Sequence, residues 1–167
     1  RAITCHKKSF PILHITKSIN NEVGNLSSIQ GSNFSIGNIL KNNDFGLYGK
    51  CNENINGKKI YILKKSELNL GKATLYLDLG NNSKKEFNIE IIEIFNNNEN
   101  SNACFKIKLV DSELLELTGG IVKGMSGSPI IQNGKLVGAL TKVTSNDVTE
   151  GYGIFAEIML NECKNIK

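Results

Sequence analysis

Apolar and polar residues alternate along most of the chain after about residue 58, and a period of two predicts β-strands. The candidate strands are residues 59–63, 73–79, 87–94, 104–110, 128–131 and 136–140. Turn-forming residues at 80–83 separate the second from the third, and Asn133-Gly134, a strong hairpin signal, separates the last two. Asn-rich loop tips are expected at 81–82 and 96–98. Before residue 58, Ser, Asn and Gly interrupt the pattern, so strands are expected there without defined bounds.

Two segments fit a helix. Residues 112–117 are expected to form a helical turn after Asp111, and residues 156–164 fit an amphipathic helix near the C-terminus. Many short strands with one late helix predict an all-β fold, either an antiparallel barrel or a sandwich.

Composition narrows the class of protein. The chain has 167 residues, 40% of them hydrophobic and 22% charged, which is typical of one globular domain. Its net charge of +4 comes from scattered lysines, and no basic, aromatic-rich face is present, so nucleic-acid binding is not expected. No apolar run is long enough to span a bilayer, and no secretory leader is expected in this segment.

The four cysteines, at positions 5, 51, 104 and 163, are far apart and form no C-x-x-C pair. A metal site of locally spaced ligands is therefore not expected. Two disulfides are possible in an oxidising compartment, but we interpret the cysteines mainly as small buried apolar residues.

The segment Gly124-Met125-Ser126-Gly127-Ser128-Pro129 carries the candidate chemistry. A serine nucleophile needs a base to take its proton and N–H donors for the oxyanion that forms on the substrate. Here Ser126 is the candidate nucleophile, and the amides of Gly124 and Ser126 are candidates for the oxyanion hole. The segment is similar to the nucleophile turn of chymotrypsin-fold proteases, in which a hairpin also follows the serine. The alternative is an ordinary Gly-rich turn between strands.

Residues 118–135, followed by Gly151-Tyr152-Gly153-Ile154-Phe155, resemble the peptidase domain of sporulation stage IV protein B (SpoIVB), a serine endopeptidase family of endospore-forming Firmicutes. Residues 45–49 are a looser match. The resemblance implies a chymotrypsin-like double β-barrel, here one domain over residues 1–167 with two barrel halves meeting near 95–105. It also implies a Ser–His–Asp triad, a protein or peptide substrate and no cofactor.

Placed on this sequence, the family serine falls on Ser126 and the family aspartate on Asp111. Asp111 also fits the N-cap of the helical turn that follows it, and both roles are compatible. The family histidine position falls on Arg1, and Cys5 occupies the aspartate position after it. Arginine stays protonated and cannot act as a base.

Three other residues are candidate bases. His6 is close to the family position, and Lys142 follows Thr141 where the family commonly has histidine. A surface role is the alternative for both. His14 lies in an apolar run and is better explained as a strand residue.

Two functions follow from these observations. The first is a SpoIVB-like serine endopeptidase, which the resemblance places in signalling between forespore and mother cell. There it would cleave a regulator of an intramembrane protease that activates a late sigma factor, outside the cytoplasm in the space between the two membranes. The second is a catalytically impaired relative that binds a peptide or protein partner at a strand edge. Arg1 favours the second function, and the complete serine turn favours the first.

Overall fold

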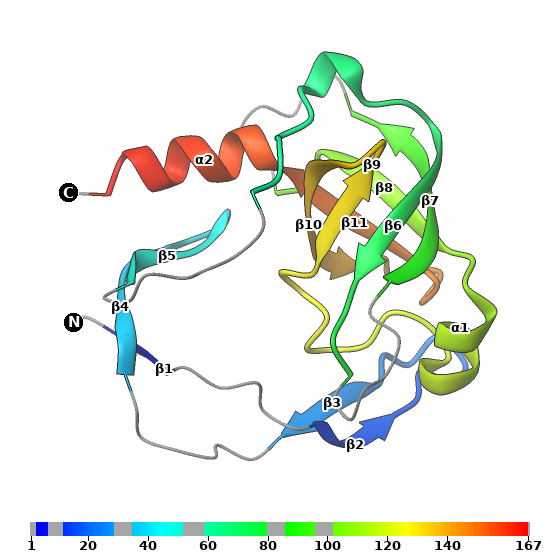
Figure 1. Cartoon of the computed structure of the whole chain (residues 1–167). Coiled ribbons are helices and arrows are strands. Elements are labelled where there is room, and N and C mark those ends of the chain that lie inside the picture. The colour runs from blue at the N-terminus through cyan, green and yellow to red at the C-terminus, as the bar shows by residue number, and fades with distance from the viewer. Residues whose placement is uncertain are drawn as a thin grey trace.

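The computed structural model describes residues 3–6, 12–28, 35–51, 59–79, 86–95 and 102–166, with the backbone alone at 3–6, 12–14, 28, 35 and 36 (Figure 1). The expected loop tips at 81–82 and 96–98 lie outside these ranges. The elements in chain order are β1 (Ile3–His6), β2 (Ile12–Thr16), β3 (Asn25–Ser28), β4 (Ser35–Asn43), β5 (Gly46–Cys51), η1 (Lys65–Glu67), β6 (Gly71–Tyr76), β7 (Glu86–Ile94), β8 (Phe105–Leu109), α1 (Ser112–Thr118), β9 (Pro129–Gln132), β10 (Lys135–Val143), β11 (Glu150–Phe155) and α2 (Ala156–Lys164).

The six strands from β6 to β11 close into an antiparallel barrel in the order β10-β11-β8-β7-β6-β9. Along β7 and β8 buried residues alternate with exposed or half-buried ones, as the period-two pattern predicts. The inward-facing side chains form one core, whose largest fully buried members include Leu75, Phe87, Ile89, Ile91, Phe105, Ile107, Ile130, Leu140 and Ile154. The predicted all-β class and C-terminal helix are confirmed.

One predicted strand is wrong and one observed strand was missed. Residues 59–63 are not a strand, because they meet β10 at a single parallel bridge between Ile62 and Leu136. Tyr61 in this segment is 83% exposed, so its apolar residues do not share one buried face. Conversely, β11 was not predicted, because glycines break its pattern. A Cβ on Gly153 would lie 2.3 Å from the Phe105 ring, so the core itself requires glycine there.

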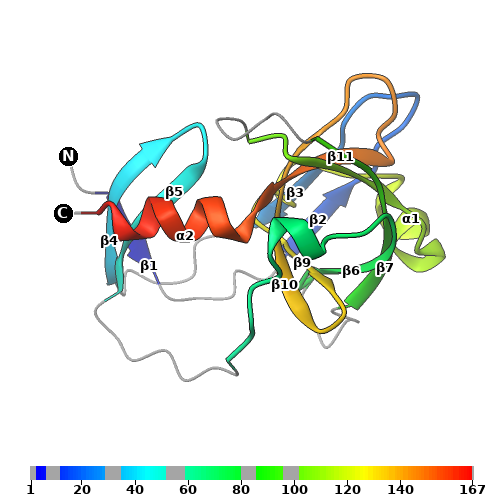
Figure 2. The ribbon, with the colours of Figure 1, turned by 90° about the horizontal axis from the view of Figure 1, so that it is seen from above.

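The strands before residue 59 form two open sheets in the described part of the chain. One has the order β1-β4-β5, and the other is the β2–β3 ribbon. Figure 2 shows β4 and β5 beside α2, and Figure 1 shows β2 and β3 near α1. A boundary near 95–105 does not fit the pairing of β7 with β8 in one barrel. A division into two halves stays a prediction, and it would have to fall before β6.

The prediction that the cysteines are mainly buried holds for one of the three whose side chains are described. Cys104 is fully buried, but Cys51 and Cys163 are exposed, and the Cys5 side chain lies outside the described residues. Cys51 and Cys163 lie near the ends of β5 and α2, away from the barrel core.

Candidate active site

The turn at residues 124–129 leads into β9 and contains two glycines with positive φ, Gly124 at 103° and Gly127 at 91°. Glycine adopts this region at little cost. Between them, the side chain of Met125 is fully buried in the core, and its N–H donates to the Val122 carbonyl at 3.2 Å. With Met125 anchored inside, the adjacent Ser126 is exposed at the surface of the barrel.

The main-chain N–H groups of this turn fall into two sets. Those of Met125, Gly127 and Ser128 donate to carbonyls within the barrel and its loops, at 2.8–3.2 Å. Among the described residues, no acceptor bonds the N–H of Gly124 or Ser126. These are the two donors expected to form the oxyanion hole, and both belong to exposed residues.

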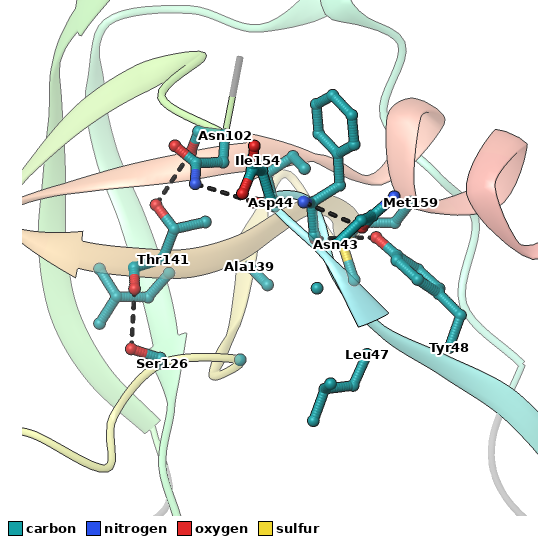
Figure 3. A pocket seen from close by; sticks show the side chains of 14 residues that line it. Asn43, Asp44, Leu47, Tyr48, Asn102, Ser126, Ala139, Thr141, Ile154 and Met159 are labelled. Atoms are coloured by element: carbon teal, nitrogen blue, oxygen red, sulfur yellow. Dashed lines mark hydrogen bonds between the residues drawn. The ribbon is translucent and has the colours of Figure 1, made fainter. Parts of the chain in front are cut away.

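The Ser126 hydroxyl donates to the carbonyl oxygen of Thr141 at 2.7 Å (Figure 3). Thr141 lies at a bulge of β10, where the pairing with β11 shifts register between Leu140 and Lys142. A peptide carbonyl accepts a hydrogen bond but does not remove the proton. Within the described part of the chain, no nitrogen base contacts this hydroxyl.

Of the residues considered as the base, the structure describes the side chain of Lys142 alone. Arg1 and the His6 and His14 side chains lie outside the described atoms, although the backbones of His6 and His14 belong to β1 and β2. Lys142 is exposed, and its Nζ lies 5.4 Å from the centroid of the Tyr152 ring. This cation–π contact is what a solvated strand lysine would make.

Asp111 is 4% exposed and forms the N-cap of α1. One carboxylate oxygen accepts the Leu114 N–H at 3.2 Å, and the other accepts the Asn88 N–H at 3.0 Å. The carboxylate thereby ties α1 to β7, as the predicted capping role requires. Asp111 does not line the cavity beside Ser126, so the structure does not bring these two predicted residues together there.

Substitutions of Asp111 separate its two possible roles. We expect Asp111→Ala to lower the free energy of unfolding by about 1–3 kcal/mol, because the N–H groups of Leu114 and Asn88 lose their acceptor. Asp111→Ser should recover part of this loss, because serine also caps helices. Urea unfolding measures both. If Asp111→Ser folds but reacts slowly with a fluorophosphonate, Asp111 also has the role of the family aspartate, which is to orient the catalytic base.

A cavity of about 420 Å³ opens beside Ser126. One wall comes from the barrel, through Ser126, Gly127, β10 and β11, and the opposite wall is the turn between β4 and β5. The apolar lining side chains are Phe45, Leu47, Tyr48, Ala139, Leu140, Ile154 and Met159, and the polar ones include Asn43, Asp44, Asn102 and Thr141. The turn contains part of the segment 45–49 that resembled the SpoIVB family more loosely.

Hydrogen bonds hold this turn against both the barrel and α2, and Figure 3 shows those on the barrel side. Asn102 donates to the Asp44 carbonyl at 2.8 Å, and its own carbonyl accepts the Thr141 hydroxyl at 2.9 Å. On the other side, Asn43 donates to the Glu162 carboxylate at 2.7 Å. Sequence reasoning missed Asn43, Asp44 and Asn102, because each is remote from Ser126 along the chain.

Two ionisable groups have shifted pKa values near this turn. Burial, with a smaller contribution from Glu162, raises the pKa of Tyr48, so the phenol stays protonated and donates to the Phe45 carbonyl at 2.9 Å. The hydrogen bond from Lys41 lowers the pKa of Glu162, so its carboxylate remains charged at neutral pH. Each shift moves the pKa further from neutral pH and so widens the pH range over which these contacts persist.

No group of three or more His, Cys, Asp or Glu side chains could hold a metal ion within the described ranges. Neither of the two described α-helices has the length and apolar character needed to cross a membrane.

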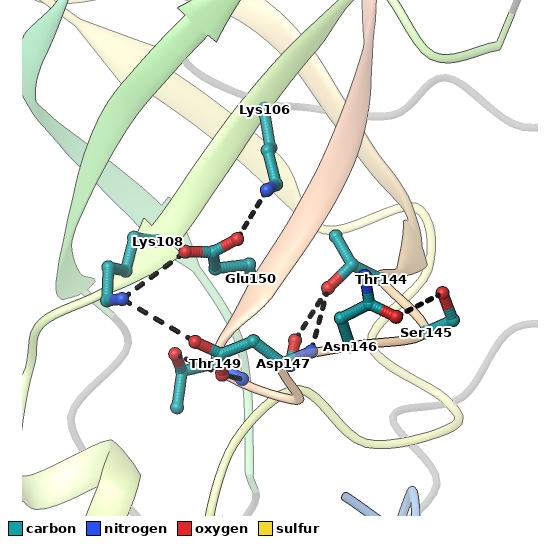
Figure 4. A network of polar contacts seen from close by, with 8 residues as sticks. All are labelled: Lys106, Lys108, Thr144, Ser145, Asn146, Asp147, Thr149 and Glu150. Atoms are coloured by element: carbon teal, nitrogen blue, oxygen red, sulfur yellow. Dashed lines mark hydrogen bonds and ion pairs between the residues drawn. The ribbon is translucent and has the colours of Figure 1, made fainter.

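A second polar network joins β8 to β11 and the loop before it (Figure 4). Glu150 pairs with Lys106 and Lys108, and Lys108 also lies 3.5 Å from Asp147. The hydrogen bond from Lys106, followed by that from Lys108, lowers the pKa of Glu150. Hydrogen bonds from Thr149 lower the pKa of Asp147.

The lowered pKa of Glu150 predicts a pH dependence. Its contribution to stability is complete above the unfolded-state pKa, about 4.3, and is lost as pH falls through the lower folded-state value. We therefore expect Glu150→Gln to lower the urea midpoint slightly at pH 7, and the difference from wild type to disappear near pH 3. Glu116→Gln, on an exposed position of α1, should change neither value. A constant difference across this pH range would contradict the assignment.

A closed antiparallel barrel that presents a serine on a Gly-x-Ser-Gly-x-Pro turn defines a serine peptidase-like domain of chymotrypsin-like fold. The chain belongs to the SpoIVB peptidase S55 family, which it matches over residues 7–160. Arg1 and His6 both precede the matched range.

Among solved structures, the chain is similar to the active form of the Rv3671c protease from M. tuberculosis, with a TM-score of 0.54 and 13% sequence identity. The similarity covers 86% of this chain and 63% of that protease. At this identity it establishes a shared fold. A comparison with curated proteins gives no match.

Proposed function

We propose that this domain is a serine endopeptidase of the SpoIVB type with Ser126 as its nucleophile. The observation that carries the proposal is the exposed Ser126 hydroxyl at the edge of a cavity, next to two N–H groups that have no acceptor among the described residues. An attacking oxygen and unoccupied donors are what acyl transfer requires.

The edge of β10 beside Ser126 supports binding of an extended peptide. β11 pairs with β10 as far as Val143, but β9 pairs with it only as far as Ala139. The Thr144 N–H donates to Glu150 on the β11 side, and successive strand residues face opposite edges. Val143 therefore presents its main-chain groups to an edge that no described strand pairs with, and a peptide could add there as a further strand.

Peptide binding there would also act on the nucleophile. A substrate N–H bound to the Thr141 carbonyl competes with the Ser126 hydroxyl, which now occupies that acceptor. Release of the hydroxyl makes its proton available to a base. The largely apolar cavity favours a substrate with a bulky apolar residue next to the scissile bond.

In the proposed reaction, Ser126 Oγ bonds to the substrate carbonyl carbon while its proton passes to the base. The N–H groups of Gly124 and Ser126 stabilise the oxyanion. Collapse breaks the C–N bond, and the base returns the proton to the leaving amine. Water then hydrolyses the acyl-enzyme ester. Lys142 is engaged in a cation–π contact with Tyr152, so we propose His6 as the substitute base. Asp111 would orient His6 if its carboxylate contacts the imidazole.

Family membership supports the biological part of the proposal. The substrate would be a protein regulator of an intramembrane protease, cleaved in sporulation signalling between forespore and mother cell. The place of action would be the space between their membranes.

The test is reaction of the intact chain with a fluorophosphonate probe, followed by peptide mapping. We expect a single adduct on Ser126, together with cleavage of an unstructured protein next to bulky apolar residues. Ser145→Ala, an exposed serine in the loop before β11, is the matched control and should label normally. Loss of labelling in His6→Ala would support His6 as the base.

The second candidate function is peptide binding without cleavage. It is favoured by the hydrogen bond from Ser126 to the Thr141 carbonyl, which leaves the hydroxyl protonated, and by Arg1 at the family histidine position. Saturable binding of the protein substrate, with neither adduct nor cleavage, would establish this function instead.

A further inference from the structure

The segment from Ser18 to Leu26 follows β2 and includes the first two residues of β3. It runs along the last residue of α1 and the loop that leads from α1 into the serine turn. Main-chain hydrogen bonds connect the two at three points. The Ser18 N–H donates to Thr118 at 2.7 Å, the Lys123 N–H donates to Gly24 at 2.9 Å, and the Leu26 N–H donates to Lys123 at 2.9 Å. Both main-chain groups of Lys123, the residue directly before Gly124, are therefore held by this segment.

The side chain of Ser18 adds a buried connection. Ser18 is 5% exposed, and its hydroxyl donates to the Ile121 carbonyl at 3.1 Å while accepting the Gly24 N–H at 2.9 Å. A single hydroxyl thus sets both the shape of the segment and its attachment to the serine loop. Removing a buried hydroxyl that both donates and accepts a hydrogen bond is costly, because its two partners are left without a bond.

The two segments also pack closely. A Cβ on Gly119 would lie 2.2 Å from the Ser18 carbonyl oxygen, and one on Gly124 would lie 3.1 Å from Leu26 Cβ. Leu26 therefore packs against one side of Gly124, which is otherwise exposed and whose N–H is one of the two proposed oxyanion donors.

We propose that the Ser18–Leu26 segment holds the oxyanion loop in its working conformation, with Ser18 as the main positioning residue. This inference rests on the proposed function of Gly124 and Ser126. Its physical basis is preorganisation: donors stabilise an oxyanion only if their orientation is set before the reaction. The loop contains Gly119, Gly120, Gly124 and Gly127, which leave it much conformational freedom unless other contacts restrict it.

The experiment compares Ser18→Ala with Ser27→Ala in the full chain. Ser27 lies in the same part of the chain, but among the described residues its hydroxyl accepts a hydrogen bond from just the exposed Asn25 side chain, at 3.1 Å. Two measurements are made on each variant. Fluorophosphonate labelling gives the maximal rate and the half-saturating concentration, and ¹⁵N relaxation gives the order parameters of the Gly124 and Ser126 amides.

We expect Ser18→Ala to lower the maximal labelling rate about tenfold with little change in half-saturation, because the hole acts mainly in the transition state. The order parameters at Gly124 and Ser126 should fall below about 0.6 while the barrel strands stay near 0.85. Ser27→Ala should match wild type in both. Unchanged order parameters in Ser18→Ala would overturn the proposal, whatever the labelling rate.

The two readouts keep this proposal separate from the proposed function. If wild type does not react but Ser18→Ala loosens the loop, the peptidase function fails and the positioning role stands. If Ser18→Ala does not fold, Leu26→Ala provides the test, because it removes the Leu26 side-chain atoms beyond Cβ that pack beside Gly124 and leaves every hydrogen bond in place. It should lower the same two order parameters, and rigid amides in it would overturn the proposal.

Discussion

Replacing Ser126 by alanine is expected to abolish fluorophosphonate labelling and to lower kcat for peptide hydrolysis by about 10³-fold or more. The reason is that no other described group at the cavity edge combines an exposed hydroxyl with neighbouring N–H donors that lack an acceptor. Peptide binding should be retained or improved, because the variant leaves the Thr141 carbonyl without its present donor. Labelling, hydrolysis and the affinity for an uncleaved peptide are measured on the same preparation.

The matched control for this prediction is again Ser145→Ala, which should leave all three quantities at their wild-type values. Residual hydrolysis at the wild-type rate in the Ser126 variant would show that another group, or a contaminating protease, performs the reaction. An equal loss of peptide affinity would indicate that Ser126 contributes to binding rather than to attack.

The largest effect on stability is expected at Gly138 in β10, where a Cβ would lie 1.7 Å from the Ile154 carbonyl oxygen and 3.1 Å from the Ala156 nitrogen. Both contacts are with main chain, which cannot move aside without opening the barrel next to β11. We therefore expect Gly138→Ala to lower the free energy of unfolding by about 3 kcal/mol or more. Urea unfolding followed by far-UV circular dichroism measures it.

Gly134→Ala is the matched control. Gly134 lies in the hairpin before β10 with a φ of 72°, and a Cβ there would meet no atom within 4 Å. Its cost should be limited to the left-handed backbone, about 1–2 kcal/mol. Equal stability losses at the two positions would show that the barrel adjusts to the added Cβ at Gly138.

Much of the barrel could be predicted because its strands carry a local signal. The strands β6, β7, β8, β9 and β10 each overlap a predicted range, and Asn133 and Gly134 both have positive φ in the predicted hairpin turn. The Asp111 N-cap was predicted for the same reason, since it depends on contacts three residues apart. β11 escaped prediction because glycines break its alternation, and one of them, Gly153, is required by the Phe105 ring, which comes from another strand.

One part of the candidate site was also predictable from local sequence, and the other part was not. Ser126 and its neighbouring amides were identified from six consecutive residues. The wall opposite Ser126, the turn at Asn43 and Asp44, had no comparable signal, because hydrogen bonds to Glu162 and Asn102 place it. Neither partner is within 50 residues of the turn, and a single sequence does not show such pairings.

By itself, the sequence determined where most barrel strands run, where the chain reverses, and which serine stands on a glycine-containing turn. These features depend on side-chain alternation and backbone preferences within a few residues. Only the tertiary structure decided what surrounds that serine: the carbonyl that accepts its hydrogen bond, the β4–β5 turn across the cavity, and Ser18, which reaches Ile121 over 103 residues of chain. Such contacts arise when the barrel closes and distant segments pack on it, and their energy depends on shapes that no short stretch of sequence encodes.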